Sequence, residues 1–421
     1  MFDFIPEEIL GYIRISFGYI FDLMPLWLPA IFLKLGFDAW IYYRRADYWN
    51  NKLGSLVLEI KLPPNVDKSP LAMELVLNQL HQTADEGNWY WKYWRGQTRS
   101  WFSLEIASFG GDIHFYIWTR KKYKNGIEAH FYSQYPGIEI YEVEDYTKNF
   151  YFDPGRHEMF ACQWQLSDID PLPISTYVDY GLDKDPDEEQ KIDPMTSQLE
   201  FLSSLPPGHN VWIQIILRAH KKEAKRLLPF GKMLENFALF EKYDAWEDEA
   251  KEEVKKILDK LKEEGSTFSR LATKGEQNRI EALQRSTSKI GFDTSIRSLY
   301  FADKDIYSSV YLGGLLGSFK QYAALGYNGF KSAGWHSTFS DPLKDWWKTD
   351  KGVLSKMVLD EYKLRNFFFS PFRGKWFYSE PFILNSEELA TVFHLPGTVA
   401  TAPGLNRVAS KKSEAPSNLP V

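Results

Sequence analysis

The residue types that most often carry catalysis are present in this chain, but their spacing matches no catalytic pattern. His157-Glu158 has no second His four residues after the first, so the helical zinc motif is missing. No G-x-S-x-G nucleophile elbow occurs. Cys162 is the single cysteine, which excludes an intramolecular disulfide, and in a predicted strand a small core residue is favoured over a nucleophile. We therefore predict a protein that is not an enzyme and has no catalytic residue, no metal site and no cofactor.

Two further segments resemble ligand-binding loops without meeting their requirements. Asp183, Asp185 and Asp187 begin like a calcium loop, but Glu188 replaces the required Gly, so a solvated acidic loop is favoured. The segment from Gly313 to Lys320 is glycine-rich but lacks the spacing of a phosphate-binding loop, which favours a small-residue packing face on a helix.

The most suggestive local pattern runs from Asn88 to Trp101, NWYWKYWRGQTRSW, in which aromatic and basic residues alternate. Rings that stack on bases beside cations that neutralise phosphates are typical of single-strand nucleic-acid binding. The same composition also suits a membrane interface, a protein partner or simple packing on a helical layer, and these alternatives stay open. The candidate nucleic-acid contacts are Lys92, Trp94, Arg95 and Arg99.

The elements around this stretch read strand, helix, strand, tight turn, strand, helix, strand. Gly110-Gly111 separates two alternating segments and is a strong hairpin signal. This order predicts an α+β fold with a ferredoxin-like β-α-β-β-α-β domain over residues 53–150, both helices lying on one face of an antiparallel sheet. The expected strands are 56–62, 101–109, 112–119 and 138–143, and the expected helices are one that Ser69 caps, with Pro70 at its first position, and one over 123–135.

The same order begins again after Tyr146, which predicts a second, tandem ferredoxin-like domain over residues 155–395. Its expected strands are 159–166, 211–217, 292–301 and, last, 381–384; its expected helices are one opened by Asp193-Pro194, one over 304–322 and a short one capped by Ser386.

Two departures from this template are expected. Residues 221–289 are highly charged and predict a helical-hairpin insertion that is either a solvated projection or a partner-binding arm. Residues 396–421 are rich in Pro, Ser, Ala and Lys and read as a flexible linker or tail.

Residues 1–50 form the most apolar segment and predict a membrane-associated helix. The run 23–43 is about as long as the roughly 20 residues that cross a bilayer, although Lys34 and Asp38 interrupt it. Positive charge directly after the run places the rest of the chain in the cytoplasm. The alternative is a buried helix of a soluble, cytoplasmic protein. The candidate anchor residues are Trp27, Trp40, Tyr42, Tyr43, Arg44 and Arg45.

Composition narrows the class of partner. The 421 residues carry a formal net charge of −6, so no global basic field indicates nucleic acid, and any such contact has to be local. The 15 Trp and the 16% aromatic share are high, and large aromatic surfaces need a core, a membrane interface or another macromolecule to cover them.

A family resemblance appears in the second half of the chain and covers nearly everything after residue 50. It is carried by Asp193-Pro194 through Leu205, by Pro207 to Arg218 (PGHNVWIQIILR), by Phe319 to Tyr322 with Asn328 to Lys331, and by Phe382 to Gly397 (FILNSEELATVFHLPG). These segments resemble the region that precedes the motor domain in type IV secretion-like, conjugative ATPases of the HerA/FtsK class from candidate-phylum bacteria.

The resemblance implies a part in a type IV secretion-like apparatus that translocates DNA or protein. In those relatives a linker leads from this region into a nucleotide-binding domain, whereas this chain ends at Val421 without a Walker lysine, so no ATPase residue is carried over. Either a stand-alone subunit with a separate motor or a truncation is implied. The expected partners are the bacterial cell membrane, a motor ATPase or other apparatus subunits; homo-oligomers and weak nucleic-acid binding stay open.

Overall fold

The computed structural model describes residues 18–19, 21–63, 68–84, 87–183, 192–224, 242–263, 273–336, 351–365, 367–369, 380–397, 402–405 and 407. Asp185, Asp187 and Glu188 of the acidic loop therefore lie outside the described residues.

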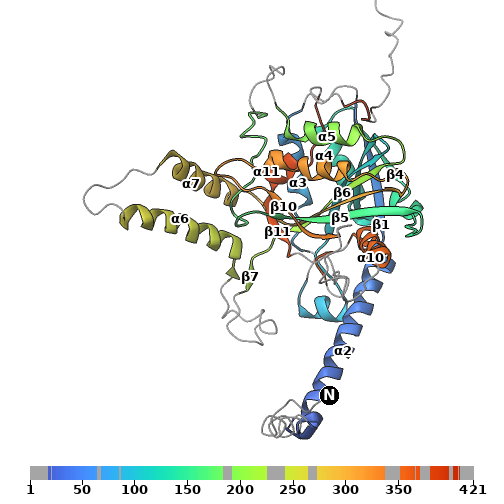
Figure 1. Ribbon diagram of the computed structural model, residues 1–421. Helices are drawn as coiled ribbons and strands as arrows, with labels where there is room; N and C mark the ends of the chain where they lie inside the picture. Colours follow the sequence, from blue (N-terminus) through green and yellow to red (C-terminus); the bar gives the residue numbers. More distant parts are fainter. Residues whose placement is uncertain are drawn as a thin grey trace, which may run out of the picture.

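The described residues build an α+β fold around one nine-stranded antiparallel sheet (Figure 1). The strand order is β10-β5-β9-β6-β2-β3-β1-β4, and β11 pairs with the part of β9 that extends beyond β5. The strands are β1 Ser55–Lys61, β2 Trp101–Phe109, β3 Asp112–Arg120, β4 Glu139–Val143, β5 His157–Leu166, β6 Asn210–Ala219, β9 Gly291–Asp303, β10 Phe330–His336 and β11 Phe382–Asn385.

The first half of the sheet has the element order predicted from the sequence. The chain runs β1, α3 (Leu71–Leu80), β2, β3, α4 (Lys124–Gln134), β4, and the spatial order is β4-β1-β3-β2. Gly110 and Gly111 form the β2–β3 turn with φ of 60° and 100°, a region that favours glycine. The predicted N-cap Ser69 is wrong, because Pro70 takes that position and no side chain caps the helix.

The second half repeats this spatial order. The chain runs β5, α5 (Pro194–Ser203), β6, β9, α8 (Val310–Gly317), β10, and the strands lie in the order β10-β5-β9-β6. α5 begins at Asp193-Pro194 as predicted, and the structure shows that Asp193 is its N-cap, since its carboxylate accepts the Met195 N–H at 2.8 Å.

The predicted last strand of the second half is wrong. Residues 382–385 form the short β11 beside the start of β9, whereas β10 supplies the edge next to β5. The Asn328 side chain explains this, because its Oδ1 accepts the Ser167 and Asp168 N–H groups at 3.0 and 2.8 Å and so fixes the start of β10 beside the end of β5.

The predicted helix over 304–322 is shorter than expected. α8 ends at Gly317, and the 3₁₀ helix Lys320–Tyr322 follows it. Glycines weaken helices by about 1 kcal/mol each, which shortens the run. Gly314 supports the predicted small-residue packing face, since a Cβ there would overlap the ring of Phe201 on α5.

The two halves share one continuous sheet, because β2 pairs with β6 from Trp101 opposite Arg218 to Phe109 opposite Asn210. Each of these strands would otherwise be an exposed edge with unpaired backbone groups. The ranges 53–150 and 155–395 are therefore joined through their edges.

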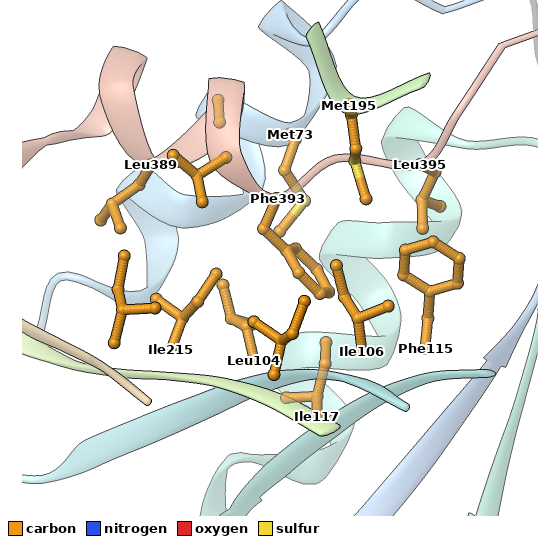
Figure 2. Packing of buried hydrophobic residues seen from close by; sticks show 14 of the residues in the cluster. Met73, Leu104, Ile106, Phe115, Ile117, Met195, Ile215, Leu389, Phe393 and Leu395 are labelled. Atoms are coloured by element: carbon orange, nitrogen blue, oxygen red, sulfur yellow. The ribbon is translucent and has the colours of Figure 1, made fainter. Parts of the chain in front are cut away.

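Helices α3, α4, α5, α8 and α11 (Ser386–Val392) lie on one face of the sheet, and the larger apolar core lies beneath them. Figure 2 shows Met73, Phe393 and Leu389 from this layer above Leu104, Ile106 and Ile215 of the strands. α11 is entirely buried. Its N-cap is Asn385 rather than the predicted Ser386, because Asn385 and Glu388 form a reciprocal capping box.

The opposite face carries a second, aromatic-rich core under α10 (Lys351–Leu364). At its centre Arg365 is fully buried and binds two carboxylates. Its Nε lies 2.7 Å from Glu105 Oε1 on β2, and its Nη1 lies 2.7 Å from Asp145 Oδ2.

The predicted helical hairpin projects from the sheet as α6 (Ala245–Glu263) and α7 (Lys274–Thr287) (Figure 1). Before α6 the chain forms a small ribbon of β7 (Glu223–Ala224) and β8 (Lys242–Tyr243). We call this projection the arm.

Part of the predicted tail is packed rather than extended. Ala402 and Leu405 are buried, and the Gly404 carbonyl accepts the Ile113 N–H at 2.7 Å beside β3. The prediction of a flexible linker is therefore wrong for residues 402–405, because the side chains of Ala402 and Leu405 are buried in the core above the sheet. Most of the remaining tail lies outside the described residues.

Candidate membrane interface

The candidate interface begins with α2 (Met24–Asp47), which extends away from the sheet (Figure 1). Pro25 lies in its first turn, where a missing N–H costs nothing, and Arg44 and Arg45 lie in its last turn, where cations suit the helix dipole. The π-helical turn Tyr48–Leu53 then leads into β1. These local preferences favour the two ends of the helix, whereas Pro29 lies inside it and leaves one backbone hydrogen bond unmade.

The described part of the chain contains one helix long and apolar enough to cross a membrane, Met24–Leu53. Only 6% of its most apolar 18-residue window is buried. A core helix of a soluble protein would be mostly buried, so this exposure counts against the buried-helix alternative. Leu26 and Leu33 are each 74% exposed.

The aromatic stretch predicted as a nucleic-acid candidate lies directly against this helix. Its π-helical turn η3 (Tyr90–Trp94) packs beside the last turns of α2. The Trp40 Nε1–H donates to the Tyr93 carbonyl at 3.3 Å, and the Arg44 Nε–H donates to the Trp94 carbonyl at 2.8 Å. The rings of Trp40 and Trp94 are 5.2 Å apart.

Gly96 permits this close approach. Its φ is +71°, and a Cβ there would lie 2.5 Å from the Arg44 backbone. The sequence therefore places two distant segments, 40–44 and 89–96, in one structure at the base of α2. We call Trp40, Arg44 and residues 89–95 the aromatic collar.

The cations of the collar lie over its rings. The Arg44 guanidinium is 5.5 Å from the Trp40 ring, and the Arg95 guanidinium is 5.9 and 5.7 Å from the rings of Tyr90 and Trp91. The Lys92 ammonium is 5.9 Å from the Tyr93 ring. In cation–π contacts of this kind, the negative face of the aromatic ring attracts the guanidinium or ammonium group and holds it against the ring.

Most of the predicted anchor residues lie on the surface of α2. Trp27 and Trp40 are each 38% exposed, and Tyr42 and Tyr43 are exposed as well. Arg45 differs, because it is buried and its guanidinium lies 5.5 Å from the Phe369 ring. Arg45 thus faces the sheet and not the surroundings of the helix.

The predicted nucleic-acid residues are divided by the structure. Trp94 and Arg95 are exposed and Lys92 is half-buried, all at the collar. Arg99 is buried, donates from Nη1 to the Ala219 carbonyl at 2.9 Å, and lies 3.8 Å from Asp293. Arg99 is therefore a structural residue of the sheet, and the prediction that it contacts a ligand is wrong.

The base of α2 is fixed by residues that sequence reasoning did not single out. The Trp49 Nε1–H donates to Thr98 Oγ1 at 3.0 Å, and its ring lies 4.8 Å from that of Trp101. The Arg120 guanidinium lies 4.4 Å from the Trp101 ring, and burial lowers the pKa of Arg120 to about 10. The one signal for this cluster was the unusual number of Trp residues.

The structure gives no catalytic geometry to the other candidates. Cys162 is buried, and burial raises the pKa of its thiol, which disfavours the thiolate that a nucleophile needs. Within the described ranges no group of three or more His, Cys, Asp or Glu side chains is placed to hold a metal ion.

Comparison with known proteins does not identify a family, since no family model and no curated protein matches this sequence.

Proposed function

We propose that this chain is a membrane-anchored, non-enzymatic adaptor whose sheet is held at the bilayer surface by α2. The observation that carries the proposal is an apolar helix that is exposed along most of its length and joined at its base to the sheet. Arg44 directly follows the apolar run, which favours a cytoplasmic position for the sheet.

Within this proposal the sheet consists of two tandem ferredoxin-like units. The strand orders β4-β1-β3-β2 and β10-β5-β9-β6 support this reading, because both correspond to the order 4-1-3-2 within their own halves. The arm is an insertion between β6 and β9 of the second unit.

We also propose, from the resemblance of residues 193–205, 207–218 and 382–397, that the adaptor belongs to a type IV secretion-like translocation apparatus. Its partner there is a separate motor ATPase that docks on the arm or on the tail. Affinity purification of the tagged chain from native membranes tests this, and recovery without any ATPase would count against it.

The anchor is tested by paired Leu→Asp changes in the full chain. Leu26→Asp with Leu33→Asp introduces two charges on the exposed surface of α2; a charge costs about 2.5–3.5 kcal/mol at the helix centre, near Leu33, and less towards the helix end, at Leu26. We expect the variant to leave carbonate-washed membranes. The matched control is Leu325→Asp with Leu258→Asp on the exposed surface of the sheet domain and arm, which should stay in the membrane.

Single-stranded nucleic-acid binding by residues 88–101 is the second candidate. Of its four predicted contact residues, Lys92, Trp94 and Arg95 lie at the surface, whereas Arg99 is buried. No salt-sensitive binding of a single-stranded oligonucleotide by the intact protein would exclude it.

A further inference from the structure

The depth of the aromatic collar is set by its contacts with α2. Residues 24–38 of the helix lie beyond the collar and, at about 1.5 Å per residue, extend about 22 Å. Trp40 and Arg44 hold η3 beside the next turns. This length is shorter than the roughly 30 Å hydrocarbon core, so if α2 enters a bilayer, as proposed above, η3 lies at the headgroup level on the side of the sheet while the Met24 end of α2 stays within the core.

The ring surface of the collar is uncovered. Trp89 and Trp94 are each 52% exposed, and Trp91 is 45% exposed. An indole has an apolar body and one N–H donor, so it is most stable where one side is apolar and the other is hydrated. The headgroup region of a bilayer provides that environment.

The charge of the collar has one sign. Arg44, Lys92 and Arg95 are its ionised groups, and the sequence contains no Asp or Glu from residue 87 to residue 104. Asp85 and Glu86 precede this stretch in the sequence, and α2 carries Asp38, one turn after Lys34, and Asp47, which lies 4.0 Å from Lys52. A negatively charged ligand is therefore favoured at this surface.

A second group of cations lies farther along the chain from the helix tip. Lys52 is on the turn after α2, and the Lys121 side chain lies beside Gly54, where a Cβ would be 3.1 Å from its Cδ. Lys122 follows and is exposed. Lys121 and Lys122 come directly after β3.

A nucleic acid fits this surface less well than a lipid does. The Arg95 guanidinium lies over the rings of Tyr90 and Trp91, which are ring faces that stacked bases would need. The collar is also held against α2, so the proposed membrane anchor places the collar next to the bilayer.

We propose that the aromatic collar binds the headgroups of anionic phospholipids, with Lys92, Arg95 and Arg44 neutralising phosphate and Trp89, Trp91 and Trp94 lying among the glycerol and carbonyl groups. This rests on the proposed membrane anchor and names the lipid class that the anchor selects.

In the test, the detergent-solubilised full-length protein is mixed with two vesicle populations and the detergent is then removed. One population is phosphatidylcholine, the other contains phosphatidylglycerol, and different internal densities allow separation by flotation. Insertion of α2 contributes to both populations, so the ratio of bound protein isolates the contribution of the collar. Each basic residue near the surface should favour the anionic vesicles about 5-fold.

The variant is Lys92→Gln with Arg95→Gln, for which we expect the preference to fall about 25-fold. The exchange Lys92→Arg with Arg95→Lys should keep the preference, which separates a charge effect from a packing effect. The matched control is Lys251→Gln with Lys256→Gln on the arm, where both side chains are exposed, and it should behave like the wild type.

The outcomes separate the two proposals. Equal insertion of the wild type into both populations, or a preference that survives the Gln variant, overturns the collar proposal and leaves the anchor intact. Wild-type protein in neither population overturns the anchor itself. Loss of the preference when a single-stranded oligonucleotide is added at the same salt concentration, with the oligonucleotide bound by the collar, assigns the surface to nucleic acid instead.

Discussion

At the scale of single residues, Arg365 combines an uncommon backbone conformation with a charged side chain that is completely buried. It is the one described non-glycine residue with positive φ, at 49°, and its side chain is 0% exposed. Non-glycine residues adopt this conformation only where surrounding contacts impose it. The Glu105 and Asp145 carboxylates supply those contacts, so the network fixes the end of α10 on β2 at the centre of the sheet.

Replacing Arg365 by Met should destabilise the protein by about 3–5 kcal/mol, because it leaves two carboxylates without their cation in the interior. Urea unfolding measures this. The companion variant Arg365→Met with Glu105→Gln and Asp145→Asn removes the charges and should recover part of the loss. Equal stability of Arg365→Met and the wild type would contradict the role given to the network.

Acid should weaken the same network. Burial alone would raise the pKa of Asp145, but hydrogen bonds and the charge of Arg365 hold that pKa below its usual value. A depressed pKa contributes stability above the unfolded-state value of about 4, which is lost as pH falls through the folded-state value. Arg365→Met should remove this part of the acid sensitivity in urea unfolding below pH 4.

Glu388 shows the opposite behaviour. Burial raises its pKa to about 8, although the Asn385 and Ile174 N–H groups donate to it. The folded state then binds more protons than the unfolded state between about pH 4.5 and pH 8, so Glu388 reduces stability as pH rises through that range. Glu388→Gln keeps an acceptor for the capping box, so the variant should match wild type near pH 5 and exceed its stability by about 2–4 kcal/mol at pH 8 to 9. A larger wild-type stability at pH 9 in urea unfolding would contradict this account.

At the scale of elements, His220 is one of several contacts that join the arm to the rest of the molecule; on α7, Arg279 and Arg285 pair with Asp168 and Asp179 at 3.0 and 2.9 Å. His220 Nδ1 lies 2.6 Å from Asp293 on β9, and its Nε2 lies 3.4 Å from Asp244, which caps α6. Burial opposes protonation of His220, but the hydrogen bond and charge of Asp293 with those of Asp244 outweigh it and raise the pKa. Its charge therefore links the start of α6 to the sheet.

Hydrogen exchange in α6 should depend on pH through this contact. A raised histidine pKa contributes stability that is fully present below the unfolded value of about 6.5 and is lost as pH rises through the folded value. After correction for intrinsic exchange rates, residues 245–263 should exchange faster at pH 9 than at pH 6. In His220→Gln this difference should disappear; an unchanged difference would show that another group holds the arm.

The elements that sequence reasoning placed well are those whose signals are local. The Gly110-Gly111 turn, the Asp193 cap and the charged arm each depend on residues that are adjacent in the chain. The error in the last strand arose where a distant contact decided the outcome, because Asn328 reaches residues 167–172 to place β10. The error in the α11 cap is local and amounts to one position: Asn385 rather than Ser386 caps the helix because Glu388, three residues later, returns its hydrogen bond.

The candidate interface was predicted only in parts, for the same reason. The apolar run and the Trp/Arg stretch are each visible in the sequence, but their pairing spans about fifty residues and depends on Gly96. Arg99 appeared equivalent to Arg95 in the sequence, yet it lies just before β2, where the chain turns into the sheet.

At the scale of the whole molecule, the pairing of β2 with β6 makes two similar halves one body. We expect the strands of both halves to lose protection against hydrogen exchange at the same denaturant concentration, because the central strands are shared by one continuous ladder. Native-state exchange of β1 and β5 measures this. Two separate transitions would show that the halves fold as independent domains.

The central claim is that α2 lies in a bilayer while the sheet stays outside it on one face. The most direct measurement introduces one cysteine at a time into the full chain. The native Cys162 is buried, so it should contribute little background labelling. Leu33→Cys and Leu325→Cys, both at exposed positions, are treated with a membrane-impermeant maleimide in intact cells and in inverted membrane vesicles. The account predicts no labelling of Leu33→Cys in either preparation and labelling of Leu325→Cys in inverted vesicles only; labelling of Leu33→Cys as fast as that of Leu325→Cys would contradict it.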